Sequence, residues 1–218
     1  MNGAELKATL KSGGRVFGTM ISIARNPKWI PILDGVGLDY VVIDTEHNYR
    51  SRGEMGDFLI MMNTSGVVPI VRIPIPDSHY VTMAMDAGAQ GVLAPYCETV
   101  EQVREVVGAA KWRPLKGEAV DRVVATGEHI SDATRAYLED RNKNSICIIG
   151  IESREAVENL EEMLKVPGID GIFVGPNDMS ISLGIPDQYD QEVYQATVKK
   201  VIDMAEAHGI ATLVHQQT

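Results

Sequence analysis

The chain has 218 residues, 44% of them hydrophobic, and a formal net charge of −10. The length suits one large α/β domain, and the negative charge argues against nucleic acid or an anionic membrane as a partner. No apolar run reaches about 18 residues and no N-terminal segment has the basic and apolar parts of a signal peptide, so we expect neither a membrane span nor a leader. Two cysteines, Cys97 and Cys147, lie in or beside apolar runs and are interpreted as buried free thiols in a reducing cytoplasm.

Short apolar segments alternate with longer amphipathic segments along the chain. Most of the apolar segments are apolar throughout, which is typical of parallel strands covered on both faces. The alternation predicts right-handed crossovers and a parallel sheet. In chain order, the predicted elements are helix 4–11, strand 16–20, helix 27–34, strand 40–44, helix 53–63, strand 68–73, helix 79–87, strand 91–95, helix 100–110, strand 145–151, helix 154–164, strand 171–174, helix 191–207 and strand 210–214.

Three segments share a rhythm that begins with Gly37, Gly88 or Gly168. Each glycine stands where a helix should end and the next strand begin, and it supplies a left-handed C-cap. Repetition of one strand–helix unit favours a closed barrel over an open sheet. We therefore predict an α/β fold, a (β/α)8 TIM barrel, in which residues 1–218 form a single domain. Only seven strands are predicted, so we expect the eighth strand and the C-terminal helix to be absent from this chain.

Residues 111–144 interrupt the alternation. They are charged and poor in apolar runs, with a short helical pattern near residues 131–140. A long excursion of this kind is typical of an active-site lid or a subunit contact. We predict an irregular insertion here within the single domain.

Two predicted strands end close to a carboxylate. Glu152 directly follows strand 145–151, and Asp178 follows strand 171–174 after a short turn. The C-terminal ends of barrel strands build the active site of such folds, and two carboxylates there suit Mg²⁺ or Mn²⁺. Each acid also has a purely structural interpretation, because a carboxylate is favourable at the start of a helix.

The turn before Asp178 reads Gly175-Pro176-Asn177. Backbone N–H groups at a helix start can bind a carboxylate or a phosphate. The alternative is a tight turn that simply requires glycine.

A second polar group follows strand 40–44. Asp44 precedes His47 by three residues, and a carboxylate at this spacing can orient a histidine and make it more basic for acid–base work. Arg72 is embedded in an apolar run and needs an anionic or carbonyl partner. The alternatives are a polar strand-end loop for the first pair and, for Arg72, a structural ion pair with Asp44 or Glu46.

The lysines exclude one class of mechanism. A Schiff-base aldolase needs a lysine that points from a strand into the pocket, and every lysine here falls in a predicted helix or loop. A metal-based mechanism therefore fits better.

These residues, in this order, resemble the HpcH/HpaI family of metal-dependent pyruvate aldolases. The likeness spans nearly the whole chain, and its most specific motif is the last. The resemblance implies a (β/α)8 barrel and a homo-oligomer, a hexamer or trimer of dimers that swap C-terminal helices. The matching segments are residues 42–47, 71–74, 86–92, 151–156 and 171–180.

The resemblance also implies roles for the candidate residues. Glu152 and Asp178 would bind the divalent cation, which the family pattern leaves open among Mg²⁺, Mn²⁺ and Co²⁺. Arg72 would contact the keto oxygen of the substrate. His47 with Asp44 would form the acid–base dyad, and the backbone of residues 175–178 would hold the pyruvate carboxylate.

The chain departs from the family pattern at two places. Gly150 stands where the family commonly has a glutamine, which removes a polar contact to the keto acid. Residues 111–120 replace a segment that is usually rich in glycine and arginine. These departures put substrate affinity and loop contacts in doubt.

The implied activity is that of a cytoplasmic carbon–carbon lyase. It would cleave a 4-hydroxy-2-oxo acid reversibly to pyruvate and an aldehyde, with a small 2-oxo acid as its binding partner. One alternative is an oxaloacetate decarboxylase or another metal-enolate lyase that uses the same site. A second alternative is a non-catalytic barrel that binds a keto acid.

Overall fold

The computed structural model describes residues 1–215 and contains a parallel sheet of seven strands. The strands lie side by side in chain order, and each neighbouring pair is parallel. All seven predicted strands are confirmed, with ends that move by one or two residues. The strands are β1 (Gly18–Ile21), β2 (Tyr40–Asp44), β3 (Val68–Arg72), β4 (Gly91–Ala94), β5 (Ile146–Ile151), β6 (Gly171–Val174) and β7 (Ala211–Val214).

The connections between strands are mainly helical. The segment predicted as helix 27–34 is the 3₁₀ helix η1 (Pro27–Gly35), which contains Pro31; a proline lacks the N–H that a continuous α-helix needs. The sequence patterns missed α5, and for α8 they indicated a helix start at residues 175–178 without giving the bounds of the helix. The α-helices are α1 (Gly3–Lys11), α2 (Arg52–Met62), α3 (Ser78–Asp86), α4 (Val100–Lys111), α5 (Glu118–Thr126), α6 (Asp132–Arg141), α7 (Arg154–Leu164), α8 (Pro176–Ser182) and α9 (Glu192–Ala207).

Polar residues begin the helices soon after the strands end. Ser51 and Glu54 form a capping box at α2, and Thr99 and Gln102 form another at α4. Ser153 caps α7 directly after β5. These side chains satisfy backbone N–H groups that the first helical turn leaves unpaired, so each strand–helix junction is short and well defined.

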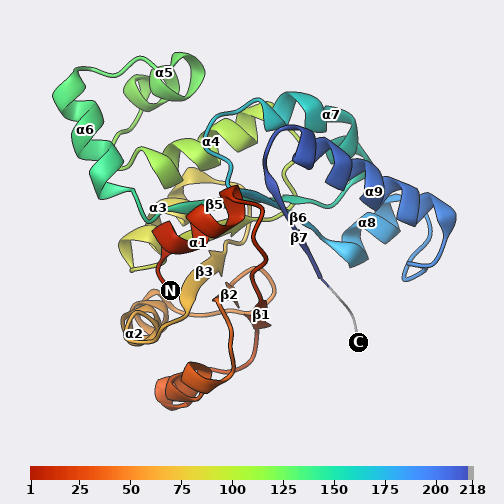
Figure 1. Cartoon of the computed structure of the whole chain (residues 1–218), viewed down its shortest axis with the longest axis horizontal. Helices are drawn as coiled ribbons and strands as arrows, with labels where there is room; N and C mark the ends of the chain where they lie inside the picture. The colour runs from red at the N-terminus through yellow and green to blue at the C-terminus, as the bar shows by residue number, and fades with distance from the viewer. Residues whose placement is uncertain (216–218) are drawn as a thin grey trace.

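The two faces of the sheet pack differently. Side chains alternate between faces along a strand, so Val41 and Ile43 join the large cluster beneath the outer helices, whereas Val42 joins a smaller cluster. That smaller cluster includes Leu6 of α1 and Ile70 of β3, which places it on the inner face, with α1 packed against it (Figure 1). The same alternation puts Asp44, Arg72 and Glu152 on the inner face.

The sheet is an open half-barrel, and the predicted closed (β/α)8 TIM barrel is wrong. Across residues 1–215, β1 pairs with β2 alone and β7 pairs with β6 alone, so no strand joins the two edges. A barrel closes only where the hydrogen-bond ladder runs all the way round. Figure 1 shows the result as a curled sheet with helices on its outer side.

The predicted insertion holds two helices. In Figure 1, α5 and α6 project from the body as an arm beyond the end of α4. Val124 of α5 belongs to the main hydrophobic cluster, and Asn142 donates to the Arg113 carbonyl at 2.9 Å, so both ends of the arm are tied to the body.

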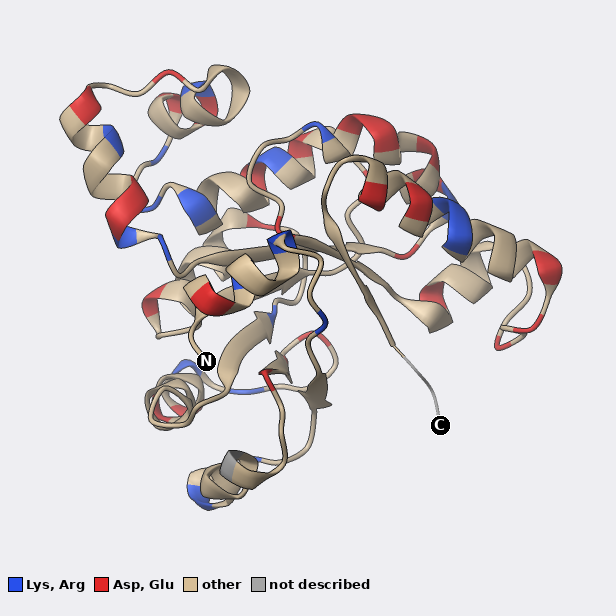
Figure 2. Ribbon diagram, viewed as in Figure 1, with Lys and Arg blue, Asp and Glu red and all other residues tan. Residues whose placement is uncertain are grey.

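Charge is spread over the outer helices. Acidic residues are frequent on α7 and α9, and basic residues lie among them (Figure 2). Of the helices in the described residues, none is both long enough and apolar enough to cross a membrane.

Candidate active site

Four strand ends bring polar side chains to one edge of the sheet. Asp44 ends β2 and lies in register with Arg72 at the end of β3. Glu152 directly follows β5, and Asp178 lies in the first turn of α8, just beyond β6. This arrangement matches the sequence prediction of where these residues lie, while their roles stay predictions.

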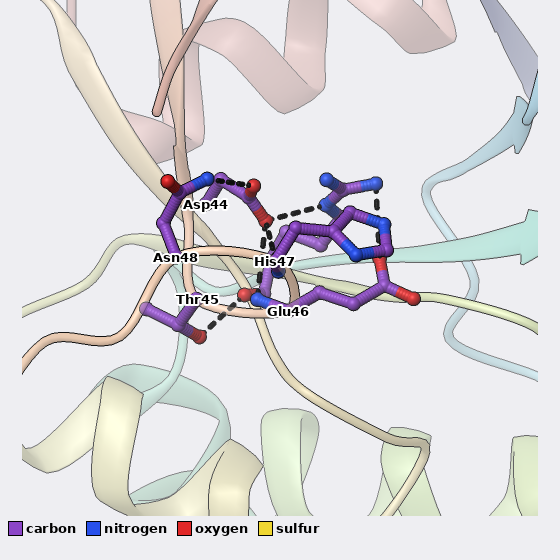
Figure 3. A network of polar contacts seen from close by, with 6 residues as sticks. Asp44, Thr45, Glu46, His47 and Asn48 are labelled. Atoms are coloured by element: carbon purple, nitrogen blue, oxygen red, sulfur yellow. Dashed lines mark hydrogen bonds and ion pairs between the residues drawn. The ribbon is translucent and has the colours of Figure 1, made fainter. Parts of the chain in front are cut away.

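Arg72 holds two carboxylates together. Its Nε donates to Asp44 Oδ1 at 2.9 Å, and its Nη1 lies 2.9 Å from Glu46 Oε2. Figure 3 shows this network around Asp44 and Glu46. The structural ion pair that the sequence offered as the alternative interpretation of Arg72 is therefore present. A guanidinium carries five N–H groups, so pairing with two carboxylates leaves it further donors for a substrate.

The Asp44 carboxyl is almost fully buried yet stays ionised. Burial alone would raise its pKa, but hydrogen bonds from Arg72 and Asn48 and the Arg72 charge hold the pKa below its ordinary value. Asn48 Nδ2 donates to Asp44 Oδ2 at 2.7 Å (Figure 3). At neutral pH, Asp44 is therefore a fixed acceptor that orients Arg72.

Glu46 differs from Asp44 although both contact Arg72. Burial raises the pKa of Glu46, with the Arg72 charge acting in the opposite direction. The sequence left the role of Glu46 open between an ion pair with Arg72 and a hydrogen bond to water on the metal. The ion pair with Arg72 is present, but the contact of Glu46 with the His47 ring could not be predicted, because it depends on the path of the loop after β2.

The ring of His47 is placed differently from the predicted dyad. Its Nε2 lies 3.6 Å from Glu46 Oε2, and the side chain is 63% exposed. Asp44 Oδ1 instead faces the backbone N–H of His47 at 3.5 Å. The structure thus sets the His47 ring beside Glu46 (Figure 3), and an acid–base role for His47 stays a prediction.

Glu152 is buried in a cradle made by two glycines. A Cβ atom added at Gly150 would lie 2.4 Å from Glu152 Oε1, and one added at Gly175 would lie 2.6 Å from its Cδ. Both distances are far below van der Waals contact, so the carboxylate occupies space that only glycine leaves open at these positions.

The hydrogen bonding of the Glu152 carboxylate is incomplete. Its Oε1 is buried without a hydrogen-bond partner in the described part of the chain. Burial, together with the charges of Glu46 and Asp178, raises the pKa of Glu152 to about 8, while Arg72 and the Tyr96 backbone amide act in the opposite direction. A buried, unpaired carboxylate is costly unless a counter-charge is supplied.

A divalent cation fits this donor set. Glu152 offers an unpartnered carboxylate oxygen, and Asp178 adds negative charge from the next strand end. Oxygen donors suit Mg²⁺ and Mn²⁺. Residues 1–215 contain no group of three Asp, Glu, His or Cys side chains placed to hold an ion by themselves, so a cation here needs further ligands from water or substrate.

The turn after β6 is supported by the loop that follows α8. Pro176 occupies the first turn of α8, and the Met179 N–H donates to the Gly175 carbonyl at 3.1 Å. The Tyr189 hydroxyl donates to Asn177 Oδ1 at 2.7 Å. The Asn177 side chain therefore has a structural contact, and what this turn offers a ligand is its backbone.

Sequence analysis missed Tyr96, which follows β4 at the same edge. It has a φ of +53°, in the left-handed region, and 41% of it is exposed. A tyrosine in a rim loop belongs to no motif, so no sequence signal pointed to it.

Two hollows lie outside this edge. One of about 790 Å³ lies between α3, α4 and the arm, and one of about 340 Å³ lies between α2 and α3 behind Thr45. Neither includes Glu152 or Asp178 in its lining. The buried carboxylates of Asp44 and Glu152 lie at the strand-end edge and line neither hollow.

Residues 19–217 match the protein family described as HpcH/HpaI aldolase/citrate lyase. A hydroxypyruvate/pyruvate aldolase of Roseobacter denitrificans is 31% identical over 210 residues, which cover 94% of this chain and 81% of that protein. The crystal structure of an HpcH/HpaI aldolase from Desulfitobacterium hafniense DCB-2 has 30% identity and a TM-score of 0.83, over 98% of this chain and 82% of that one. The citrate synthase SbnG has 27% identity and a TM-score of 0.82 over the same shares.

Proposed function

The chain belongs to the HpcH/HpaI aldolase/citrate lyase family, and we propose that it is a divalent-metal-dependent aldolase. The reaction is reversible cleavage of a 4-hydroxy-2-oxo acid to pyruvate and an aldehyde. The observation that carries this proposal is the buried Glu152 carboxylate, which has an unpartnered oxygen and shares the strand-end edge with Asp178 and Arg72.

Glu152 and Asp178 would hold the cation, which is Mg²⁺ or Mn²⁺, with Co²⁺ as a further candidate. When bound, it supplies Lewis-acid polarisation of the 2-oxo group. The backbone N–H groups of Gly175, Asn177 and Asp178 bind the substrate carboxylate, since Pro176 has none. This arrangement orients the substrate with its 2-oxo oxygen toward Arg72.

Arg72 stabilises the charge that develops during cleavage. Asp44 and Glu46 fix its guanidinium at Nε and at Nη1, so its remaining N–H groups donate to the 2-oxo oxygen without reorganisation. Preorganised donors of this kind are typically worth about 10²–10³ in rate.

His47 accepts the proton of the 4-hydroxyl group when the C3–C4 bond breaks. Its exposed ring lies beside Glu46 rather than beneath other side chains, so it can reach a substrate that enters from the open edge. Glu46, whose carboxylate lies 3.6 Å from the ring, orients it.

A second activity uses the same groups. Decarboxylation of oxaloacetate also leaves negative charge on the 2-oxo oxygen of pyruvate, so Arg72 and the cation would serve it equally. One similar structure is that of the citrate synthase SbnG, which is not named as an aldolase, and this supports retaining a second activity as the alternative.

The test is pyruvate release from a panel of 4-hydroxy-2-oxo acids and from oxaloacetate, with Mn²⁺ or Mg²⁺ and with EDTA. Chelator-sensitive pyruvate from the hydroxy acids would support the aldolase. Release from oxaloacetate alone would move the assignment to decarboxylation. Binding of keto acids without turnover, in folded and metal-loaded protein, would favour the non-catalytic alternative.

The predicted assembly is also part of this proposal. We infer a cytoplasmic homo-oligomer, a hexamer or trimer of dimers. The unpaired edges of β1 and β7 within residues 1–215 support association, because open strand edges pair readily unless they are covered. Light scattering of the purified protein measures the mass directly, and a monomer at micromolar concentration would contradict it.

A further inference from the structure

The smaller of the two hollows lies on the outer face of the sheet. It has a volume of about 340 Å³ and lies between α2 and α3, and it is named the α2–α3 hollow below. Val71 and Ile73 line it, and both belong to the large cluster on the outer face. The Arg72 side chain points to the opposite face, because neighbouring residues of a strand alternate between faces. The α2–α3 hollow is therefore separated by β3 from the candidate active site.

The lining of this hollow combines an apolar body with positive charge. Met55 of α2 and Met83 and Ala84 of α3 contribute to the apolar part. Arg50 and Arg52 add two guanidinium groups, and none of the described residues that line the hollow is Asp or Glu. The larger hollow differs, because acidic and basic side chains both line it. In a chain with a net charge of −10, a hollow whose charged lining is cationic favours an anion.

Arg50 is buried, and its hydrogen bonding is incomplete. The residue is 9% exposed, and its Cζ lies 5.1 Å from the centroid of the Phe58 ring. Its Nη2 donates to the Ala24 carbonyl at 2.6 Å. Its Nε is buried without a hydrogen-bond partner in residues 1–215. A buried donor on a charged group costs free energy while it is unpaired, and an acceptor on a ligand would remove that cost.

The charge of Arg50 also lacks a direct counter-charge. Burial lowers the pKa of Arg50, as does the charge of Arg25, while the charges of Glu54 and Asp44 act in the opposite direction. Glu54 pairs with Arg25 at 3.5 Å, and Asp44 pairs with Arg72 at 2.9 Å. No carboxylate of the described residues forms an ion pair with Arg50. An anion in the hollow would supply one.

Arg52 marks the exposed side of the hollow. It is the first residue of α2 and is exposed, and its Nη2 lies 3.3 Å from His79 Nε2. Tyr49, which also lines the hollow, is 79% exposed. A ligand therefore enters past Tyr49 and Arg52 and meets Arg50 at the buried side.

We propose that the α2–α3 hollow binds a small monocarboxylate that carries an apolar body. The carboxylate accepts from the Arg50 guanidinium, and the apolar body packs against Met55, Ile73 and Met83. Charge-assisted hydrogen bonds from arginine to a carboxylate are roughly twice as strong as neutral ones. The volume lies at the lower end of the range of about 300–1,000 Å³ for ligand pockets, so the body is about the size of one aromatic ring. This site goes beyond the proposed function and does not depend on aldolase activity.

The experiment measures binding of 4-fluorophenylacetate by ¹⁹F NMR, with 4-fluorophenylacetamide as the neutral analogue. EDTA is present throughout, and each titration is repeated with excess pyruvate, so binding at the candidate active site is recognised. Wild type is compared with Arg50→Gln and with Ala87→Leu, since Ala87 is half-buried, lines the hollow and ends α3. The control is Arg122→Gln, which removes an exposed arginine of α5 outside the hollow.

Wild type should bind the carboxylate with a Kd below about 1 mM, and pyruvate should not displace it. The amide should bind at least about tenfold more weakly, because it carries no charge for Arg50 to pair with. Arg50→Gln should lose at least about tenfold in affinity for the carboxylate. Ala87→Leu should lose as much by filling the hollow, and Arg122→Gln should stay within about twofold of wild type.

Three results would overturn the inference. The first is equal affinity for the amide and the carboxylate, or wild-type affinity in Ala87→Leu, and both remain decisive if Arg50→Gln does not fold. The second is displacement of the probe by pyruvate, which would place it in the candidate active site. The third is absence of probe binding in wild type. In that case a lower mass of Ala87→Leu by light scattering would assign the hollow to a contact between copies of the chain.

Discussion

Glu152 is the residue on which the proposed metal site depends most. It is 1% exposed, and its side chain fills space that Gly150 and Gly175 leave open. The negative charges of Glu46 and Asp178 add to its burial and raise its pKa to about 8. A fold keeps such a group where a cation or a proton supplies the missing charge.

This environment predicts a pH-dependent stability. The pKa of Glu152 rises from 4.5 to about 8 in the folded protein, so the folded state retains a proton that the unfolded chain releases. Stability of the metal-free protein should therefore fall as pH rises from about 4.5 to about 8, by up to about 1.4 kcal/mol per pH unit from this group.

Glu152→Gln removes that titration. Urea unfolding in the presence of EDTA at pH 5, 6, 7 and 8 gives the free energy of unfolding at each pH. This free energy should depend less on pH in the variant than in wild type. The stability of the variant relative to wild type should therefore increase as pH rises. Parallel curves for the two proteins would contradict the assigned pKa. Glu101→Gln, at an exposed position on α4, is the control and should parallel wild type.

At the level of residues, the sequence predicted where the side chains lie on the fold better than which side chains they contact. Asp44, Arg72 and Glu152 lie where strand alternation and strand ends place them, because those depend on local periodicity. The contact of the His47 ring with Glu46 could not be predicted, since it depends on the loop after β2. Tyr96 was missed because backbone strain at a non-glycine residue leaves no sequence signature.

At the level of elements, the junction between β4 and β5 is the most constrained. Gly150 of β5 would place a Cβ not only against Glu152 but also 3.0 Å from the Pro95 Cα. An added methyl group therefore displaces either the carboxylate or the backbone of the rim loop. Gly150 is thus needed for the observed geometry, whatever contact to substrate it removes.

Gly150→Ala should weaken Mn²⁺ binding by at least about tenfold and destabilise the protein by about 1–3 kcal/mol, as overpacking does. Gly56→Ala is the matched control. A Cβ at Gly56, in the middle of α2, meets nothing within 4 Å, so that variant should gain about 0.5–1 kcal/mol. Calorimetric titration with Mn²⁺ and urea unfolding measure both effects, and equal metal affinity in the two variants would contradict the cradle.

Most elements could be predicted from sequence because their signals are local. Apolar runs gave the seven strands, and amphipathic segments gave most of the helices between them. The helix α8 has only seven residues, with Gly175 as its N-cap and Pro176 in its first turn, so the sequence indicated a helix start here but not how far the helix extends. The 3₁₀ geometry of η1 follows from an internal proline whose effect was underestimated.

At the level of the whole molecule, closure was the prediction that failed. The repeated strand–helix unit is shared by closed and open parallel sheets, and only pairing between the first and last strands distinguishes them. That pairing is non-local, so the periodicity of the sequence carries no information about it. In residues 1–215 the sheet remains open at β1 and β7.

The single-domain prediction can be tested with the two tryptophans. Trp29 of η1 packs near Phe58, with ring centroids 5.8 Å apart, and Trp112 at the base of the arm lies 4.8 Å from His129. Trp112→Phe leaves fluorescence from the sheet side, and Trp29→Phe leaves fluorescence from the arm. One cooperative domain predicts that the fluorescence midpoint of each variant coincides with its own far-UV circular dichroism midpoint. An arm signal that unfolds well before the circular dichroism change would show a separate unit.

The central claim is that Glu152 and Asp178 together hold a catalytic cation. The most direct measurement is Mn²⁺ binding and metal-dependent pyruvate release by Asp178→Asn, beside the exposed control Asp190→Asn. The account predicts that Asp178→Asn loses metal affinity and at least about 10²-fold in turnover together, while the control keeps both. Metal-dependent turnover at the wild-type level in Asp178→Asn would contradict it.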